Sequence, residues 1–111
     1  MSEVTDRIQS AIAQNKIMIF MKGNRSFPQC GFSATTVQIF EELGVPFATA
    51  DVLSDPELRD AIKRFSNWPT IPQVYLNGKF LGGCDIVREL YENGELQQMV
   101  KSVAEQPTQA K

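Results

Sequence analysis

Histidine is absent from this chain of 111 residues, and cysteine occurs only twice, at Cys30 and Cys84. The absence of histidine excludes Ser-His-Asp and Cys-His catalysis, zinc sites that use imidazole, and histidine-based pH switches. Two cysteines this far apart in the sequence are too few for a disulfide scaffold or for a four-thiolate metal site within one chain. We therefore expect a protein of a reducing compartment, with chemistry that depends on single thiols or on other groups.

Long apolar runs and clusters of positive charge are also missing. The longest apolar run, Ile17–Met21, is far shorter than the ~20 residues that cross a bilayer. The N-terminus carries the acids Glu3 and Asp6 where a signal peptide needs positive charge. The 11 Lys and Arg residues are outnumbered by 13 Asp and Glu residues, and they form no run that would favour nucleic acid. We expect a cytoplasmic protein with no membrane and no nucleic-acid partner.

Hydrophobic residues make up 42% of the chain, which is enough for one buried core. We expect a single domain over residues 1–105, followed by a disordered tail at 106–111. The first strand is apolar at successive positions, as in a central strand covered on both faces. Periodicity and capping residues predict helices at 4–14, 32–43, 56–65, 85–91 and 95–103, and strands at 17–20, 45–52, 73–76 and 79–81.

The ends of these elements carry local signals. Ser54 is the predicted N-cap of the third helix, ahead of Pro56, and Asp85 is the predicted cap of the fourth. Two strand-helix-strand steps favour parallel pairing through right-handed crossovers, and the Asn77-Gly78 turn predicts an antiparallel hairpin. The order of elements therefore predicts an α/β fold: a four-stranded mixed sheet with helices on both faces.

Cys30 is the first candidate for chemistry, because the pattern places it at the N-terminus of the second helix. A helix N-terminus stabilises a nearby anion by up to ~2 kcal/mol, and Lys22 after the preceding strand would add to this effect. A reactive thiolate is expected, and an inert core cysteine is the alternative. Ser33 holds the position of the second thiol in a Cys-x-x-Cys centre, which excludes a dithiol cycle at this helix. Cys84 is either a partner of Cys30 under oxidation or a small buried residue.

Four separated motifs carry a resemblance to a known family. They are Phe20-Met21-Lys22-Gly23, Cys30-Gly31-Phe32-Ser33, Trp68-Pro69-Thr70-Ile71-Pro72 and Gly82-Gly83-Cys84-Asp85. In this order, and over nearly the whole chain, they resemble the single-domain monothiol glutaredoxins of the Cys-Gly-Phe-Ser type. The resemblance implies a thioredoxin-like fold with a cis peptide bond before Pro72, where an ordinary trans proline is the alternative. We expect Trp68 to pack beneath the loop of Ile71 rather than to contact substrate.

The resemblance also implies glutathione as the ligand. Lys22 and Arg59 would hold the glycyl carboxylate, the Ile71 backbone would pair with the cysteinyl residue, and Cys84 with Asp85 would receive the γ-glutamyl end. Two cations suit one carboxylate, while the amides and the carboxylate at the start of the fourth helix suit the other end of the tripeptide. Solvated surface charge is the alternative for the two cations.

For function, the resemblance implies a homodimer bridged by a labile two-iron two-sulfur (2Fe-2S) cluster. Cys30 of each chain, as metal ligand, and one glutathione on each would supply the four thiolates that such a cluster needs. The cluster would serve iron-sulfur assembly, transfer and iron homeostasis, with BolA-like proteins and iron-sulfur recipient proteins as partners.

An enzyme is the alternative function. In this reading Cys30 is the catalytic thiol of a glutathione-dependent thiol-disulfide oxidoreductase that removes glutathione from mixed disulfides. The resemblance disfavours this activity, because Gly31-Phe32-Ser33 stands in place of the Pro-Tyr pair of the enzymatic branch of the family and residues Gly23 to Phe27 are inserted relative to that branch. A plain interaction module without a ligand is a third reading, and it leaves the co-occurrence of the site residues unexplained.

Overall fold

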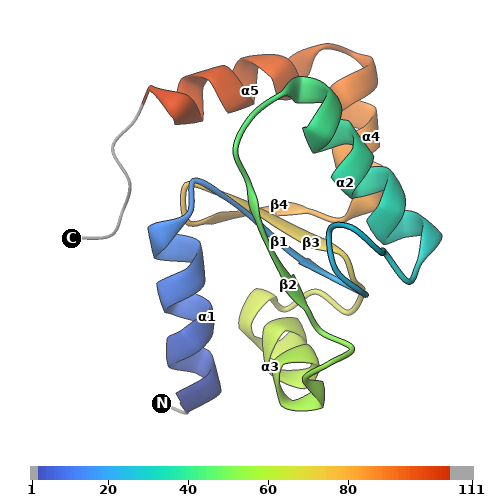
Figure 1. Ribbon diagram of the computed structural model, residues 1–111. Helices are drawn as coiled ribbons and strands as arrows, with labels where there is room; N and C mark the ends of the chain where they lie inside the picture. The colour runs from blue at the N-terminus through green and yellow to red at the C-terminus, as the bar shows by residue number, and fades with distance from the viewer. Residues whose placement is uncertain (1–2, 106–111) are drawn as a thin grey trace.

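The computed structural model describes residues 3–105, so the tail expected at 106–111 lies outside the described residues. Helices and strands follow one another in the predicted order (Figure 1). Their bounds are α1 Glu3–Gln14, β1 Ile17–Met21, α2 Gly31–Leu43, β2 Ala48–Asp51, α3 Pro56–Ser66, β3 Gln73–Leu76, β4 Lys79–Gly82, α4 Cys84–Glu92 and α5 Glu95–Ala104. No helix within residues 3–105 has the length and apolar character needed to reach across a bilayer.

The strands form a four-stranded mixed sheet in the order β2-β1-β3-β4. β1 pairs parallel with β2 and antiparallel with β3, and β3 pairs antiparallel with β4. The predicted mixed sheet is confirmed, but the parallel pairing expected of the second strand-helix-strand step is wrong. β3 begins at Gln73 opposite Phe20, near the sheet end where β2 finishes opposite Met21. The connection through α3 thus returns the chain to the same end of the sheet, and β3 must run in the opposite direction.

Each face of the sheet is covered by its own set of helices (Figure 1). Side chains alternate along a strand, so Met18 and Phe20 of β1 join the core of α1 and α3, where Ile8 and Ile62 are buried. The other side chains of β1 join the core of α2, α4 and α5, which includes Phe40. All residues of β1 are buried. This two-sided burial explains the continuous apolar run and confirms helices on both faces.

Two turns lie where the sequence predicts them. Asn77 and Gly78 adopt left-handed conformations, with φ of 49° and 84°, and form the predicted hairpin between β3 and β4. Gly44 ends α2 in a left-handed conformation with φ of 71°. Because only such residues enter this region at low cost, both turns could be located from the sequence.

Three predicted boundaries need correction. Asp55, not Ser54, is the N-cap of α3: its side chain accepts a hydrogen bond from the Leu58 N–H, while the Ser54 hydroxyl donates to the Asp51 carbonyl. Asp85 is not a cap either, because α4 begins one residue earlier, after Gly83. β2 is shorter than the predicted 45–52 segment.

Candidate functional site

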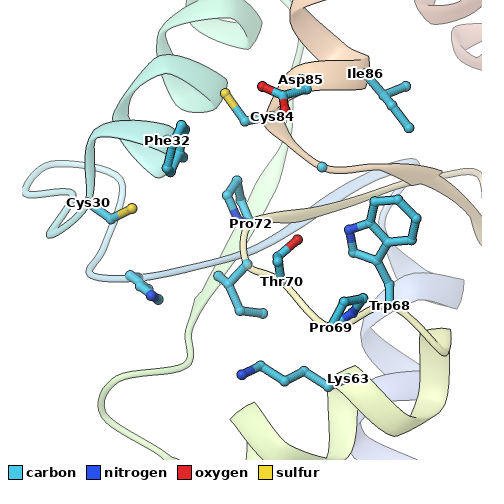
Figure 2. Close-up of a pocket in the computed structure, with 13 residues that line it drawn as sticks. Cys30, Phe32, Lys63, Trp68, Pro69, Thr70, Pro72, Cys84, Asp85 and Ile86 are labelled. Atoms are coloured by element: carbon cyan, nitrogen blue, oxygen red, sulfur yellow. The ribbon is translucent and has the colours of Figure 1, made fainter.

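A cavity of about 480 Å³ opens where β1 ends and α2 begins (Figure 2). Its walls come from parts of the chain that are distant in sequence: the residue after β1, the start of α2, the end of α3, the segment before β3, and the start of α4. The lining residues are Lys22, Cys30, Phe32, Lys63, Trp68, Pro69, Thr70, Ile71, Pro72, Gly83, Cys84, Asp85 and Ile86.

Cys30 is the N-cap residue of α2, with extended backbone angles, so the predicted position at a helix N-terminus is confirmed. Its thiol is free and partly exposed. Hydrogen bonding from the backbone N–H of Ser33 lowers the pKa of Cys30 below its usual value, and partial burial opposes this shift. The Phe32 N–H, the charge of Lys22 and the Ser33 hydroxyl lower the pKa further. The site therefore favours a thiolate.

Ser33 occupies the place of a second thiol and has a structural role that sequence reasoning missed. Its side chain is fully buried, and its Oγ accepts a hydrogen bond of 3.1 Å from the Lys22 backbone N–H. This bond ties the residue after β1 to the first turn of α2. The position that completes a dithiol centre is therefore filled by a hydroxyl that holds the site together.

The loop between Lys22 and Cys30 has a defined structure. Gly23 has φ of 84°, and a Cβ at this position would lie 2.5 Å from the Phe27 carbonyl oxygen. The Asn24 side chain accepts hydrogen bonds from the backbone N–H groups of Ser26 and Phe27. This short polar side chain closes the turn. Only a glycine fits where the loop folds back on itself.

Arg25 fastens the same loop to the body of the protein. Its guanidinium forms an ion pair with Glu41 of α2 and lies 3.8 Å from the centre of the Phe47 ring, just before β2. A further hydrogen bond runs from Arg25 Nη1 to the Phe47 carbonyl oxygen. The loop residues that the family resemblance marks as an insertion are thus held against α2 and against Phe47.

The opposite wall is the segment that leads into β3. The Ile71–Pro72 peptide bond is cis, as the family resemblance implies. The side chain of Gln73 is fully buried, and its Nε2 donates hydrogen bonds to the carbonyl oxygens of Trp68 and Thr70. This bent segment therefore has a fixed shape beside the cavity.

The start of α4 completes the cavity. Gly83 is its N-cap and provides no side-chain hydrogen bond to the first amides of the helix. Cys84 is a buried, free thiol, whereas Asp85 is exposed and pairs with Arg88 at 3.4 Å. Figure 2 shows Cys30 and Cys84 on two sides of the same cavity. A helix N-terminus with open amides favours an anionic group.

Five of the six residues predicted for the site line this cavity, and one does not. Lys22, Cys30, Ile71, Cys84 and Asp85 line the cavity, but Arg59 is exposed on α3 and is not part of the lining.

Lys63 lines the cavity in a place where the sequence suggested only Arg59. It lies on α3 one helical turn after Arg59, so helical periodicity places both on one side of the helix. That spacing was a signal that could have identified it. Trp68 also lines the cavity, although its ring packs against Phe80 at 5.7 Å between centroids. Trp68 therefore packs against a neighbouring ring, as a packing residue does, and also forms part of the cavity wall.

The arrangement suits an extended ligand with a reactive sulfur. Lys22 and Lys63 line the cavity together with Cys30, the Ile71–Pro72 segment forms one wall, and the first turn of α4 offers amides and a carboxylate. Such a cavity can hold an extended peptide by its backbone and its charged ends.

Comparison with known proteins agrees with the fold. The glutaredoxin family model matches residues 17–81. A monothiol glutaredoxin of Synechocystis is 59% identical over 99 residues, which cover 89% of this chain and 92% of that protein. Glutaredoxin 4 of Escherichia coli is 46% identical over 104 residues, covering 94% and 90% of the two chains.

Solved structures lead to the same family. Reduced apo GrxS14 of poplar superimposes with a TM-score of 0.81 at 44% identity, over 91% of this chain and 93% of that one. A truncated mutant of Trypanosoma brucei 1-C-Grx1 gives a TM-score of 0.84 at 34% identity, over 94% of each chain. The resemblance noted in the sequence is confirmed, and with its thioredoxin-like fold and single thiol at α2 this chain belongs to the glutaredoxin family as a single-domain monothiol glutaredoxin.

Proposed function

We propose that this protein binds glutathione and carries a labile 2Fe-2S cluster between two copies of the chain. The observation that carries the proposal is Cys30 itself: one accessible thiol with a lowered pKa, at the mouth of a cavity, with a buried serine where a second thiol would resolve a disulfide. A thiolate without a second thiol at the Cys-x-x-Cys position suits a metal ligand. The cluster is cargo for iron-sulfur assembly, transfer and iron homeostasis.

Glutathione fits the cavity by its charges. Lys22 and Lys63 suit the glycyl carboxylate, and the Ile71 backbone suits pairing with the cysteinyl residue. The amides that open α4, together with Asp85, suit the α-carboxylate and ammonium of the γ-glutamyl end. Arg59 would then act on the glycyl end from outside the cavity. In this pose the glutathione thiol points toward Cys30.

The number of thiolates requires two copies. A 2Fe-2S cluster needs four thiolates, whereas the described part of the chain holds no group of three or more His, Cys, Asp or Glu side chains suited to a metal ion. One Cys30 and one glutathione from each of two copies supply four. Because half of these ligands are exchangeable small molecules, the cluster would be released easily, which suits donation to recipient proteins.

The surface beside Cys30 supports a contact at this end of the molecule. Phe27 and Phe32 are 71% and 60% exposed, and they are two of the three exposed large hydrophobic residues in the range 3–105. Both flank Cys30 in the sequence, and exposed apolar side chains around a site are typical of interaction surfaces. This surface would face the second copy, or a BolA-like partner in its place.

Anaerobic reconstitution tests the proposal. The reduced protein is incubated with iron, sulfide and glutathione, and visible absorption and mass by size-exclusion chromatography are recorded. We expect a chromophore that requires glutathione and elutes as a dimer. Cys30→Ser should lose both, and Cys84→Ser, the matched cysteine control, should keep both. A cluster that forms equally well in Cys30→Ser would contradict the proposal.

Thiol-disulfide exchange is a second candidate function, favoured by the lowered pKa of Cys30. The Cys30 thiolate would attack the glutathione sulfur of a mixed disulfide, and the target protein would leave as a thiolate. A second glutathione thiolate would then attack the Cys30–glutathione disulfide, releasing Cys30 and oxidised glutathione. If no cluster forms while mixed disulfides are reduced at useful rates, this is the main function.

A further inference from the structure

Gln73, the first residue of β3, carries a polar side chain that is enclosed in the protein. Its Nε2 donates hydrogen bonds to the carbonyl oxygens of Trp68 at 3.1 Å and of Thr70 at 3.3 Å. Its Oε1 accepts a hydrogen bond of 3.4 Å from the hydroxyl of Tyr75, which is also buried. The amide thus uses its donors and its acceptor, and the two carbonyls fix its orientation because a carbonyl only accepts.

The bond to Thr70 sets the direction of one peptide group in the cavity wall. The Thr70–Ile71 peptide bond is trans, whereas the Ile71–Pro72 bond is cis. In a planar trans peptide the C=O and the N–H point in opposite directions. The Thr70 carbonyl points inward to the buried amide of Gln73, so the Ile71 N–H points the other way. That way leads to the cavity, whose wall contains Thr70 and Ile71 (Figure 2).

The Ile71 N–H has no partner within the described protein. Among residues 3–105, no hydrogen bond uses this N–H as its donor. Backbone N–H groups of folded proteins are nearly all paired, with protein groups or with water. A backbone carbonyl of a peptide in the cavity would therefore complete the pairing, as a neighbouring strand does. A donor that is held in place before binding also loses less entropy when it pairs.

We propose that Gln73 is a positioning residue for peptide binding: its side-chain amide holds the Thr70 carbonyl inside the protein and thereby aims the Ile71 N–H at the ligand. The inference rests on the proposed binding of glutathione and deepens it. Without the amide donors the Thr70 carbonyl would be buried and unpaired, which is costly. The peptide group would then turn and present a carbonyl to the carbonyl of the ligand. Gln73 acts without touching the ligand, since it is not part of the cavity lining.

The unmodified full-length protein gives the first test. In 15N-labelled protein, the backbone amide of Ile71 and the side-chain amide of Gln73 are followed by NMR during titration with glutathione. We expect the Ile71 amide proton to move downfield as it donates to the ligand. The Gln73 side-chain proton that is bonded to Thr70 should move downfield with it, because a peptide group whose N–H donates has a more strongly accepting carbonyl. A Gln73 signal that stays in place while Ile71 responds would overturn the inference.

Two substitutions then separate positioning from packing. Gln73→Met keeps the length of the side chain but has no donor, and Gln73→Glu keeps its shape but loses both donors when ionised. At pH ~9, above the raised pKa of most buried carboxyls, both should weaken glutathione binding about fivefold, the effect of one hydrogen bond. The response of the Ile71 amide should be lost, while the Asp85 amide at the start of α4 still shifts.

The pH dependence of Gln73→Glu is a readout that a packing defect would not move. Burial raises the pKa of the introduced carboxyl, so lowering the pH from ~9 to ~6 protonates it and supplies an O–H donor. Glutathione affinity, taken relative to the unmodified protein at the same pH, should recover, and in Gln73→Met it should not. Val100→Ala, a truncation in the core under α5, should lower stability but leave the relative affinity unchanged at every pH.

The outcomes separate this inference from the proposed function. If glutathione shifts the amides of Ile71 and Asp85 equally in Gln73→Met and in the unmodified protein, the protein binds glutathione and the role of Gln73 is wrong. A relative affinity of Gln73→Glu that stays low at pH ~6 would also reject that role, because the donor is then restored without effect. If no amide of the unmodified protein responds to glutathione, both the proposed function and this inference fail. The titration of the unmodified protein decides the role of Gln73 even if neither variant folds.

Discussion

The backbone N–H of Lys22 donates a hydrogen bond of 3.1 Å to the buried side-chain oxygen of Ser33. The backbone N–H of the same serine is the largest cause of the lowered pKa of Cys30. Ser33 therefore fixes the lysine that follows β1 and also stabilises the thiolate at the start of α2. The residue that removes dithiol chemistry from this site is also the one that assembles the site.

Ser33→Ala should destabilise the protein. The Lys22 N–H would lose its acceptor, and leaving such a donor unpaired costs about 1–3 kcal/mol. Urea unfolding measures the free energy of unfolding. Ser10→Ala is the matched control, because Ser10 accepts a hydrogen bond from Gln14 on the exposed surface of α1, and surface changes of this kind stay within about 0.5 kcal/mol. Equal losses in the two variants would contradict the structural role of Ser33.

Cys30 should react at lower pH than an ordinary thiol. In a Cys84→Ser background, the rate of alkylation by iodoacetamide should reach half of its plateau below pH ~8.5, the pKa of a free cysteine. Lys22→Gln removes a positive charge that lowers the pKa of Cys30, so the midpoint should move to higher pH. Lys79→Gln, a charge change on β4 away from the cavity lining, should leave it unchanged. A midpoint unaffected by Lys22→Gln would exclude the charge effect.

The same ionisation should appear in the pH dependence of stability. The pKa of Cys30 is lower in the folded than in the unfolded chain, so the ionised thiol adds stability that is fully present above the unfolded pKa. This contribution is lost as the pH falls through the folded pKa. In the Cys84→Ser background, the stability difference between Cys30 and its Cys30→Ser variant should therefore grow as the pH rises through this window. A difference that is constant with pH would count against the shift.

Gly23 and Gly31 should respond in opposite ways to alanine. Gly23 has a positive φ, and an added Cβ would meet backbone atoms of Phe27 and Gln29 at 2.5 and 2.6 Å. Gly23→Ala should thus cost more than about 1 kcal/mol of stability. Gly31 opens α2 with no atom within 4 Å of an added Cβ, so Gly31→Ala should be neutral or slightly stabilising. Thermal unfolding of both variants checks the contrast, and a tolerant Gly23 would refute the tight loop.

Cys84 gives a redox prediction. Cys30 and Cys84 are free thiols that line one cavity, so mild oxidation without glutathione should join them. Intact mass should fall by the two thiol hydrogens, and the oxidised protein should no longer accept a cluster until it is reduced. Detection of both thiols as free or glutathionylated after oxidation would reject this pairing and leave Cys84 as a small buried residue.

The elements that the sequence predicted correctly carry strong local signals. The continuous apolar run of β1 reflects burial on two faces, and the Asn77-Gly78 pair specifies its turn through the positive φ of both residues. The helical pattern that follows Cys30 likewise predicted the thiol at the start of α2.

The features that were missed depend on contacts between distant segments. The direction of β3 is set by where α3 returns the chain, and local periodicity carries no such information. Asp55 displaces Ser54 as the N-cap while its side chain also pairs with Arg7 of α1. Lys63 lines the cavity and Arg59 does not, because Lys63 lies one turn closer to the segment before β3, where its carbonyl oxygen accepts a hydrogen bond from the Trp68 N–H. The direction of β3, the N-cap of α3 and the cation that lines the cavity are all determined by tertiary packing.

The pairing of β1 with β3 joins two halves of the chain that each supply one wall of the cavity. Lys22, the anchored loop and Cys30 lie in the β1–α2–β2 half, which is contiguous in sequence, whereas the segment of Ile71 and the start of α4 lie in the other half. The acidity of Cys30 is thus a local property of the first half, but a complete binding cavity exists only once the two halves have docked. The acidity of the thiol therefore depends on contacts within one half of the chain, whereas the shape of the binding cavity depends on the pairing of β1 with β3.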